Sequence, residues 1–303
     1  VKELLEQGFS VLTYDLPGHG LSDGYPANIK NFDHYQHVLH AVYQYVKNAD
    51  QLPKPWLGIG QSTGGAIWMH HLLEFAQRRE NPFVERVLLL SPLIRPAKSA
   101  WWHNSVGLGI IRRIKREVPR HFRRNNHNPE FLRFVRLKDP LQPRMMGMDW
   151  ILAMSKWMLE MEERPACRIP VWLAQGAQDQ TVDWRYNIEF IRRKFRLQTL
   201  LMLEEGSHQL INERADIRAA LTGLIPAFLH AHYVPHLSIR SRLGLQFFFQ
   251  RYSQFDEKDR ALYYAVTRQI LGLPDVRGVW DTTREKRFGT FRVAVRARSL
   301  TST

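Results

Sequence analysis

Two hydrophobic patterns alternate along most of the chain. Uninterrupted apolar runs, typical of strands buried in a sheet, occur at 56–60, 84–90, 171–174 and 199–203. Apolar residues at steps of three and four positions predict amphipathic helices at 32–46, 64–79, 184–194 and 213–230. Strands that alternate with helices in this way predict an α/β fold with a mostly parallel sheet and right-handed crossovers.

The start of the chain predicts the end of a helix, a strand and a tight turn. Residues 1–7 have the pattern of a last helical turn closed by Gly8, and the β-rich run 9–15 predicts a strand that ends at the turn 16–20. Neither a Met nor the start of a helix precedes the helical turn at residues 1–7. We therefore expect that the true N-terminus and the first strands of the sheet lie upstream of Val1.

Two blocks of the sequence depart from the alternation and carry most of the positive charge. Residues 93–160 have helical patterns without a strand-like run, and they hold 14 Lys and Arg against 5 Asp and Glu. Residues 236–303 hold 13 against 6, in a chain of net charge +14. We predict a discontinuous core (residues 1–92 and 161–235), a helical cap insertion (residues 93–160) and a basic C-terminal extension (residues 236–303) without an assigned role.

The composition of the chain excludes several classes of protein. Apolar residues make up 44% of it and aromatic residues 12%, which excludes a disordered chain and allows a large core. The one cysteine, Cys167, excludes an internal disulfide bond and a four-thiolate zinc site. No apolar run approaches the roughly 20 residues that a membrane-spanning helix needs. We expect a cytoplasmic globular protein that contacts a membrane only peripherally.

The strongest chemical signal is Gly60-Gln61-Ser62-Thr63-Gly64, a G-x-S-x-G pattern. It lies between a predicted strand and a predicted helix, which is the setting of a nucleophile elbow; the alternative is an ordinary glycine-rich turn. Because the turn is too sharp for large neighbours, we expect that glycine is needed two residues before and two residues after Ser62. The helix that follows directs its first amides at developing negative charge.

A serine hydroxyl needs a base at neutral pH, and His208 is the best placed of the 13 histidines. It lies in the loop after the strand 199–203, where parallel sheets present reactive groups. Asp179, in the loop after strand 171–174, is preferred as the orienting acid over Asp183, which stands where a helix needs an N-cap. Other histidines lie in helices and are interpreted as surface or packing residues: His34, His37, His40, His70 and His71.

The motifs together resemble the α/β-hydrolase superfamily and, within it, the monoacylglycerol lipase and lysophospholipase family, whose hydrolase domain is like that of serine aminopeptidase S33. The resemblance covers about residues 1–232. It rests on the chain order Ser62, Asp179, His208. It also rests on the signature 14–24, the elbow Gly-Gln-Ser-Thr-Gly-Gly, the loops Gly-Ala-Gln-Asp-Gln-Thr-Val and Glu-Glu-Gly-Ser-His-Gln-Leu-Ile-Asn-Glu, and the cap segments 128–130 and 138–141.

The resemblance implies a catalytic triad of Ser62, His208 and Asp179 that hydrolyses an ester through an acyl-enzyme, without a metal or organic cofactor. It also implies that the Thr63 amide forms half of an oxyanion hole, and that a His-Gly loop, which would precede Val1, forms the other half. Gln61 stands where the family often has a histidine, so we expect it to tune the site.

The aromatic and Met-rich cap favours a bound acyl chain, and hence a single-chain lipid ester such as a lysophospholipid or a monoacylglycerol. The alternative for these residues is simple packing of the cap. A thioesterase, a small-ester esterase or an acyltransferase on the same fold stays open, as does a catalytically impaired protein that binds anionic surfaces. We expect no nucleic-acid partner, because no nucleic-acid motif accompanies the charge.

The cap sequence also predicts contact with a membrane. Trp101, Trp102 and the aliphatic residues of 106–111 precede a cluster of cations: Arg112, Arg113, Lys115, Arg116, Arg120, Arg123 and Arg124. Apolar side chains can enter the headgroup region of a membrane while cations bind its anionic phosphates. We expect the cap to dock peripherally on an anionic membrane; the alternative is a solvated basic face that the tryptophans pack on the core.

Overall fold

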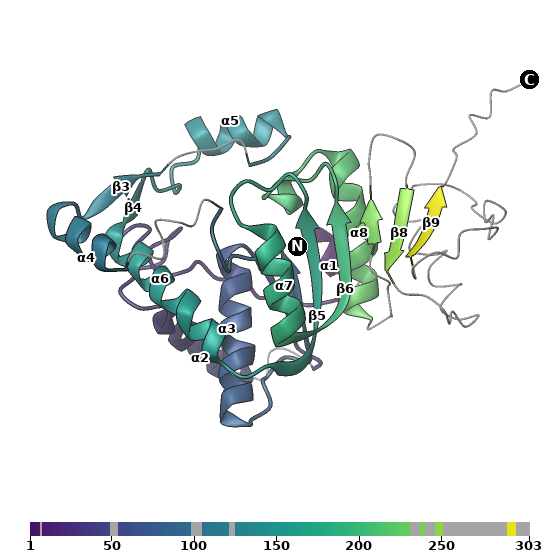
Figure 1. Ribbon diagram of the computed structural model, residues 1–303, viewed down its shortest axis with the longest axis horizontal. Coiled ribbons are helices and arrows are strands. Elements are labelled where there is room, and N and C mark those ends of the chain that lie inside the picture. The colour runs from purple at the N-terminus through teal and green to yellow at the C-terminus, as the bar shows by residue number, and fades with distance from the viewer. Residues whose placement is uncertain are drawn as a thin grey trace, which may run out of the picture.

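The computed structural model of the chain describes residues 1–6, 8–48, 54–97, 105–120, 125–230, 237–239, 246–250 and 290–294. Its centre is a parallel sheet of five strands (Figure 1). In spatial order these are β1 (Leu57–Gln61), β2 (Arg86–Leu90), β5 (Cys167–Gly176), β6 (Phe195–Leu203) and β7 (Leu237–Ile239). Every neighbouring pair is parallel, which confirms the sheet type that the alternating pattern predicts.

Helices cover both faces of this sheet, because its strands are apolar on both faces. Val87 and Leu89 of β2 belong to one hydrophobic cluster and Leu88 to a second, as the period of two along a strand requires. The first cluster takes buried residues from α2 (Asp33–Asn48), α3 (Thr63–Arg78) and α7 (Trp184–Lys194), and the second from α8 (Ala215–Leu229). All four helices lie within a few residues of the predicted ones.

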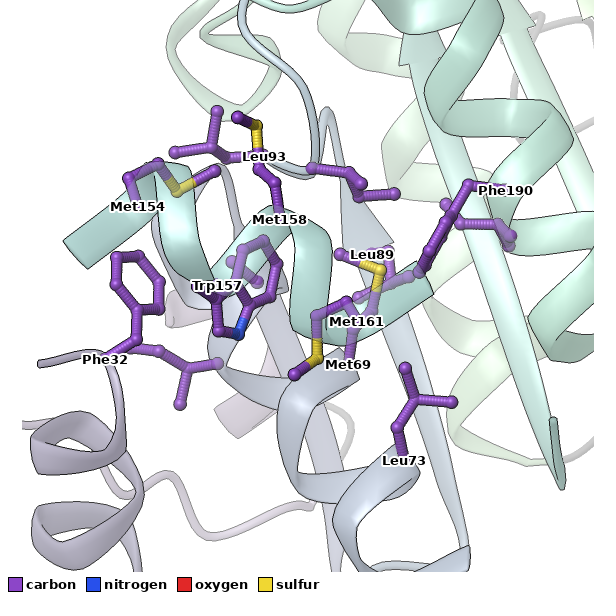
Figure 2. Packing of buried hydrophobic residues seen from close by; sticks show 14 of the residues in the cluster. Phe32, Met69, Leu73, Leu89, Leu93, Met154, Trp157, Met158, Met161 and Phe190 are labelled. Atoms are coloured by element: carbon purple, nitrogen blue, oxygen red, sulfur yellow. The ribbon is translucent and has the colours of Figure 1, made fainter. Parts of the chain in front are cut away.

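The helix α6 (Met148–Glu163) packs into the first cluster. Its Met154, Trp157 and Met161 are almost fully buried there, in the same cluster as Phe32 and Met69 (Figure 2). Packing therefore accounts for the Met and Trp residues of this helix, and they need no bound acyl chain to explain them. The helix also continues past residue 160, where the predicted cap ends.

Between β2 and α6, the described residues form four short elements: α4 (Ser105–Ile114), β3 (Glu117–Pro119), α5 (Pro129–Leu137) and β4 (Met145–Gly147). Besides its helices, this segment contains two strands that its sequence does not indicate, because β3 and β4 pair as an antiparallel ribbon. Strands of three residues are too short to show a period of two in the sequence. Residues 98–104, with Trp101 and Trp102, and residues 121–124, with Arg123 and Arg124, lie outside the described residues.

The predicted strand at 9–15 is wrong. The chain begins with the short helix α1 (Lys2–Glu6), and residues 9–16 have no regular structure before the turn that begins at Pro17. Within the described chain, no backbone hydrogen bond joins residues 10–15 to a strand. A β-rich sequence forms a strand only where a neighbouring strand pairs with it. The turn itself forms as predicted, with positive φ angles of 71° at Gly18 and 56° at Gly20.

The parallel sheet extends beyond residue 235, where the predicted core ends. Leu237 of β7 pairs with Leu201 of β6, so part of the predicted extension belongs to the sheet. Farther along the chain, β8 (Gln246–Gln250) and β9 (Thr290–Ala294) form an antiparallel ribbon. The division into core, cap and extension stays a prediction. Among the described residues, no helix combines the length and the apolar character needed to cross a membrane.

Two neighbouring histidines of α3 lie in the core beside α2. His70 is 1% exposed and His71 is 0% exposed, and Nδ1 of His71 lies 3.2 Å from Nε2 of His40. The rings of Phe75 and Phe83 pack against His71. Burial lowers the pKa of both His70 and His71 to about 3, because a charged ring would lose its water. Both are therefore packing residues, as the sequence analysis expects.

We predict that acid destabilises the fold through these two rings. A histidine of the unfolded chain binds a proton below about pH 6.5, whereas the pKa of each buried ring is about 3. The free energy of unfolding therefore falls as the pH drops below about 6.5, by up to about 1.4 kcal/mol per pH unit for each ring. Urea unfolding at pH 7 and at pH 5 should show a smaller difference for His71→Gln than for the wild type.

The control for this prediction is His34→Gln, which makes the same change at an exposed position of α2. If His71→Gln loses as much stability between pH 7 and pH 5 as the wild type does, burial of this ring is not the cause of the acid sensitivity.

Candidate active site

Ser62 lies in the sharp turn between β1 and α3. Its backbone has a φ of 50° and a ψ of −115°, a strained conformation for a residue with a side chain. The Ser62 N–H donates to the Leu90 carbonyl at 3.1 Å, and the Leu93 N–H donates to the Ser62 carbonyl at 3.0 Å. The end of β2 and the residues just after it thus hold the strained turn on both sides of Ser62.

The turn depends on glycine at two positions, one of which differs from the prediction. A Cβ atom on Gly60 would lie 2.5 Å from the Gly64 carbonyl group, so only glycine fits there. A Cβ atom on Gly64 would meet nothing within 4 Å, so the expected need for glycine two residues after Ser62 is wrong. The second close approach falls one residue later, because a Cβ atom on Gly65 would lie 2.7 Å from Cβ of Pro92.

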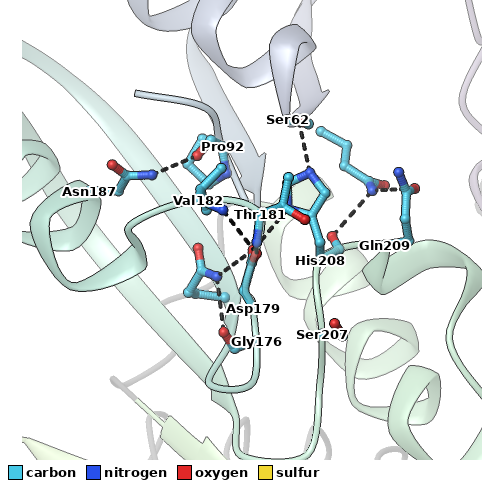
Figure 3. A network of polar contacts seen from close by, with 12 residues as sticks. Ser62, Pro92, Gly176, Asp179, Thr181, Val182, Asn187, Ser207, His208 and Gln209 are labelled. Atoms are coloured by element: carbon cyan, nitrogen blue, oxygen red, sulfur yellow. Dashed lines mark hydrogen bonds and ion pairs between the residues drawn. The ribbon is translucent and has the colours of Figure 1, made fainter. Parts of the chain in front are cut away.

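The three predicted catalytic side chains meet at the carboxyl edge of the sheet (Figure 3). Nε2 of His208 lies 2.9 Å from Oγ of Ser62, and Nδ1 of His208 lies 2.8 Å from Oδ2 of Asp179. His208 is 2% exposed and Asp179 is 6% exposed. Because a carboxylate only accepts hydrogen bonds, Nδ1 carries the ring proton, and Nε2 is left to accept from the Ser62 hydroxyl.

The carboxylate of Asp179 is fixed on both oxygens. Oδ1 accepts the backbone N–H groups of Thr181 at 2.8 Å and of Val182 at 3.1 Å. Oδ2, which faces His208, also accepts from Nε2 of Gln175 at 3.2 Å. These donors compensate for burial of the carboxylate and set the direction in which it faces the imidazole.

Asp183, the alternative acid, is used in another way. Its side chain accepts from the Tyr186 N–H at 3.3 Å and caps the N-terminus of α7, which is the structural role that the sequence predicts. Oδ2 of Asp183 also accepts from Nη2 of Arg95 at 2.5 Å. The structure therefore brings Asp179, and not Asp183, to His208.

Two glutamines support the loops of the site. Gln61 donates to Oε1 of Gln209 at 2.8 Å and so joins the elbow to the histidine loop. Gln175, the buried residue before Gly176, donates to Asp179. Gln61 is expected from the sequence to tune the site, whereas Gln175 is not among the predicted site residues. The available signal for Gln175 is an amide side chain at the end of an apolar strand.

The first free amide of α3 borders Ser62. The Ser62 N–H is bonded to Leu90, whereas the Thr63 N–H has no backbone acceptor among the described residues. It lies at the N-terminus of a helix of 16 residues, where backbone amides carry partial positive charge. The Thr63 amide is therefore suitably placed next to Ser62 for the predicted oxyanion contact, and that role stays a prediction.

The sequence of the chain matches a known family of enzymes. The family described as serine aminopeptidase S33 matches residues 1–215 of the chain. The chain belongs to this S33 family. It is an enzyme of the α/β-hydrolase class with the α/β-hydrolase fold, which confirms the resemblance found in the sequence. No curated protein matches the sequence of this S33 hydrolase.

Solved structures of lipases resemble the S33 hydrolase in fold. A monoacylglycerol lipase from Paleococcus ferrophilus has a TM-score of 0.59 and 17% identity, over 76% of this chain and 88% of that chain. A soluble variant of monoglyceride lipase from Saccharomyces cerevisiae, in complex with a substrate analogue, has a TM-score of 0.58 and 14% identity, over 73% and 76%. A lipase in its open form has a TM-score of 0.57 and 18% identity, over 77% and 84%.

We predict that Asp179→Asn slows the S33 hydrolase far more than Asp183→Asn. An asparagine at 179 can present an N–H group to His208, which favours the wrong ring tautomer, and the corresponding change in a serine protease lowers kcat by about 10⁴-fold. Asp183→Asn keeps a side-chain oxygen for the helix cap and should cost less than tenfold. The measurement is kcat for a soluble p-nitrophenyl ester. A larger loss in Asp183→Asn would identify Asp183 as the acid.

Proposed function

We propose that the S33 hydrolase cleaves the carboxylic ester of a single-chain lipid, a monoacylglycerol or a lysophospholipid. The observation that carries the proposal is the continuous hydrogen-bond chain from Asp179 through His208 to Ser62 in a half-buried, strained turn. An arrangement of this kind lets a neutral imidazole activate a serine hydroxyl. The monoacylglycerol lipases among the structural neighbours support the choice of lipid class.

In the proposed acylation step, Oγ of Ser62 attacks the ester carbonyl carbon while Nε2 of His208 takes the hydroxyl proton. Asp179 holds the imidazole and stabilises its positive charge. The Thr63 amide donates to the oxyanion of the tetrahedral intermediate, at the positive end of α3. The carbon–oxygen bond to the alcohol then breaks, and His208 returns the proton to the leaving alkoxide, which leaves an acyl group on Ser62.

In the proposed deacylation step, water replaces the alcohol. Nε2 of His208 takes a proton from the water as its oxygen attacks the acyl carbon, and a second tetrahedral intermediate forms beside the Thr63 amide. Its collapse breaks the bond to Oγ of Ser62 and returns the proton to that oxygen. The products are a carboxylic acid and the free enzyme. A thioesterase or a small-ester esterase would use the same steps, so only the substrate distinguishes these alternatives.

The surface of the predicted cap supports a lipid substrate through a second feature. On α4, Ile110, Ile111 and Ile114 are 57%, 45% and 80% exposed, and residues 112–116 are exposed with four cations among them. On α5, Phe134 is 48% exposed and Leu137 is 70% exposed, between further exposed cations. A surface on which apolar side chains alternate with cations is better suited to contact with an anionic lipid surface than to exposure to water. We propose that α4 and α5 dock on such a surface, from which the lipid reaches Ser62.

We predict that Ser62→Ala abolishes ester hydrolysis without loss of fold, because Oγ is the attacking atom. His208→Ala should be almost as severe, because nucleophile and base act as one unit. A fluorophosphonate probe should label the wild type and not Ser62→Ala. Lipid profiling should show that the wild type, and not Ser62→Ala, consumes single-chain esters. Circular dichroism controls for folding. Undiminished turnover by purified Ser62→Ala would contradict the proposed function, and a preference for thioesters would select the thioesterase.

We predict that the protein co-sediments with anionic vesicles and not with neutral phosphatidylcholine vesicles. Each cation near an anionic surface contributes about 1 kcal/mol, and salt screens this attraction. Binding should therefore fall steeply with salt and fall in a cap variant with reversed charges: Arg113→Glu, Lys115→Glu and Arg116→Glu. The control reverses three exposed cations outside the predicted cap: Lys30→Glu, Arg168→Glu and Arg196→Glu. Equal loss in both variants, equal binding to both vesicle types, or no binding to either type would rule out electrostatic docking of the cap.

A further inference from the structure

The cap segment 125–128 lies directly on the loop that carries His208. The Asn125 carbonyl accepts the backbone N–H groups of His208 and Gln209, both at 3.1 Å. The side chain of Asn126, which is fully buried, donates to the Gln209 carbonyl at 2.9 Å. These contacts hold the backbone from which the imidazole projects, and they come from a segment more than 80 residues away in the sequence.

Glu213 is a fully buried carboxylate at the centre of this contact. Its Oε1 accepts the Ser207 N–H at 2.9 Å and lies 3.0 Å from Nδ1 of His127. Its Oε2 accepts the His127 N–H at 2.9 Å. Ser207 directly precedes His208, so one carboxylate joins the cap segment to the histidine loop. A buried carboxylate is costly unless its oxygens are hydrogen-bonded, and here both are.

We propose that Glu213 is a positioning residue for His208, and that it clamps the cap segment 125–128 onto the histidine loop. From the other side, Gln61 donates to Gln209, so the loop is held between the clamp and the elbow. The clamp acts on the imidazole only through the backbone. This inference rests on the proposed function, because its main consequence is a change in the rate of ester hydrolysis. A displacement of a catalytic group by about 1 Å lowers such a rate by about 10²-fold.

The first test is the kinetics of Glu213→Gln. Glutamine keeps the shape of the side chain but replaces one acceptor oxygen with an NH₂ donor. This donor then faces one of the three N–H groups that the Glu213 carboxylate accepts, so that hydrogen bond is lost. We expect kcat for a soluble p-nitrophenyl ester to fall about 10-fold to 10²-fold with an unchanged KM, since the substrate contacts stay. Glu163→Gln makes the same change at an exposed position of α6 and should leave both constants unchanged.

The partner residue gives a second pair of variants. Nδ2 of an asparagine can stand where Nδ1 of His127 stands, so His127→Asn should retain the wild-type kcat. His127→Leu removes this donor and should lower kcat as Glu213→Gln does, and the double variant should be no slower than either single one. If Glu213→Gln does not fold, the His127 variants decide the question, because His127 lies at the edge of the contact and is 23% exposed.

A measurement without substrate separates the clamp from the proposed function. Hydrogen–deuterium exchange of peptides that cover residues 205–211 should be faster in Glu213→Gln and His127→Leu than in the wild type and His127→Asn, at unchanged melting temperature. A wild type that neither reacts with a fluorophosphonate nor hydrolyses esters would refute the proposed function, while exchange would still test the clamp. If Glu213→Gln and His127→Leu show the same exchange in the loop as the wild type, the positioning role of Glu213 is overturned. The same holds if the wild type is active and both variants keep its kcat.

Discussion

The register of the parallel sheet determines where the polar residues of the site meet. Leu90 of β2 pairs with Gln61 on one side and with Ala174 on the other, and Gly176 pairs with Leu203. The strands β5 and β6 therefore end level with each other, and β1 ends two residues before them at the same edge of the sheet. The loops that follow these three strands carry the nucleophile, acid and base of the proposed mechanism. A slip of one residue would move a loop by about 3.3 Å, more than any hydrogen bond of the site tolerates.

The strained turn at Ser62 is the local counterpart of this constraint. A positive φ at a residue with a side chain costs about 1–3 kcal/mol, and it persists only where the surroundings hold it. Here Leu90, the last residue of β2, and Leu93, just beyond the strand, provide the two hydrogen bonds, while Gly60 and Gly65 allow α3 to approach the strand and Pro92. The strain and the sheet register thus depend on each other, because a displaced β2 would release Ser62.

The amino-acid sequence predicts the parts of the structure that depend on nearby residues. Strands buried on both faces leave continuous apolar runs, and the elbow at Ser62 has its glycines beside it, so these are visible without coordinates. The run 9–15 shows the limit, because a strand exists only when another strand pairs with it. Glu213 shows the same limit in the site, because its partner His127 lies 86 residues away and no motif connects the two.

The predicted cap combines two physical roles that its sequence does not separate. Its last helix, α6, is part of the core, whereas α4 and α5 expose apolar side chains among cations. The clamp segment 125–128 directly precedes α5 in the chain. Asn128 accepts the first amides of α5, at 3.1 and 3.2 Å, and its own N–H donates to Asn126 at 2.6 Å.

A displacement of α5 would therefore reach the histidine loop through Asn126 and Asn128, two residues whose polar groups are bonded on both sides. Since Asn126 is buried, it cannot yield without breaking its bond to Gln209. If the exposed face of α5 binds a lipid surface, the position of the helix on that surface and the position of His208 are no longer independent. The proposed docking face and the proposed catalytic base would then be coupled by a short chain of hydrogen bonds rather than by the core.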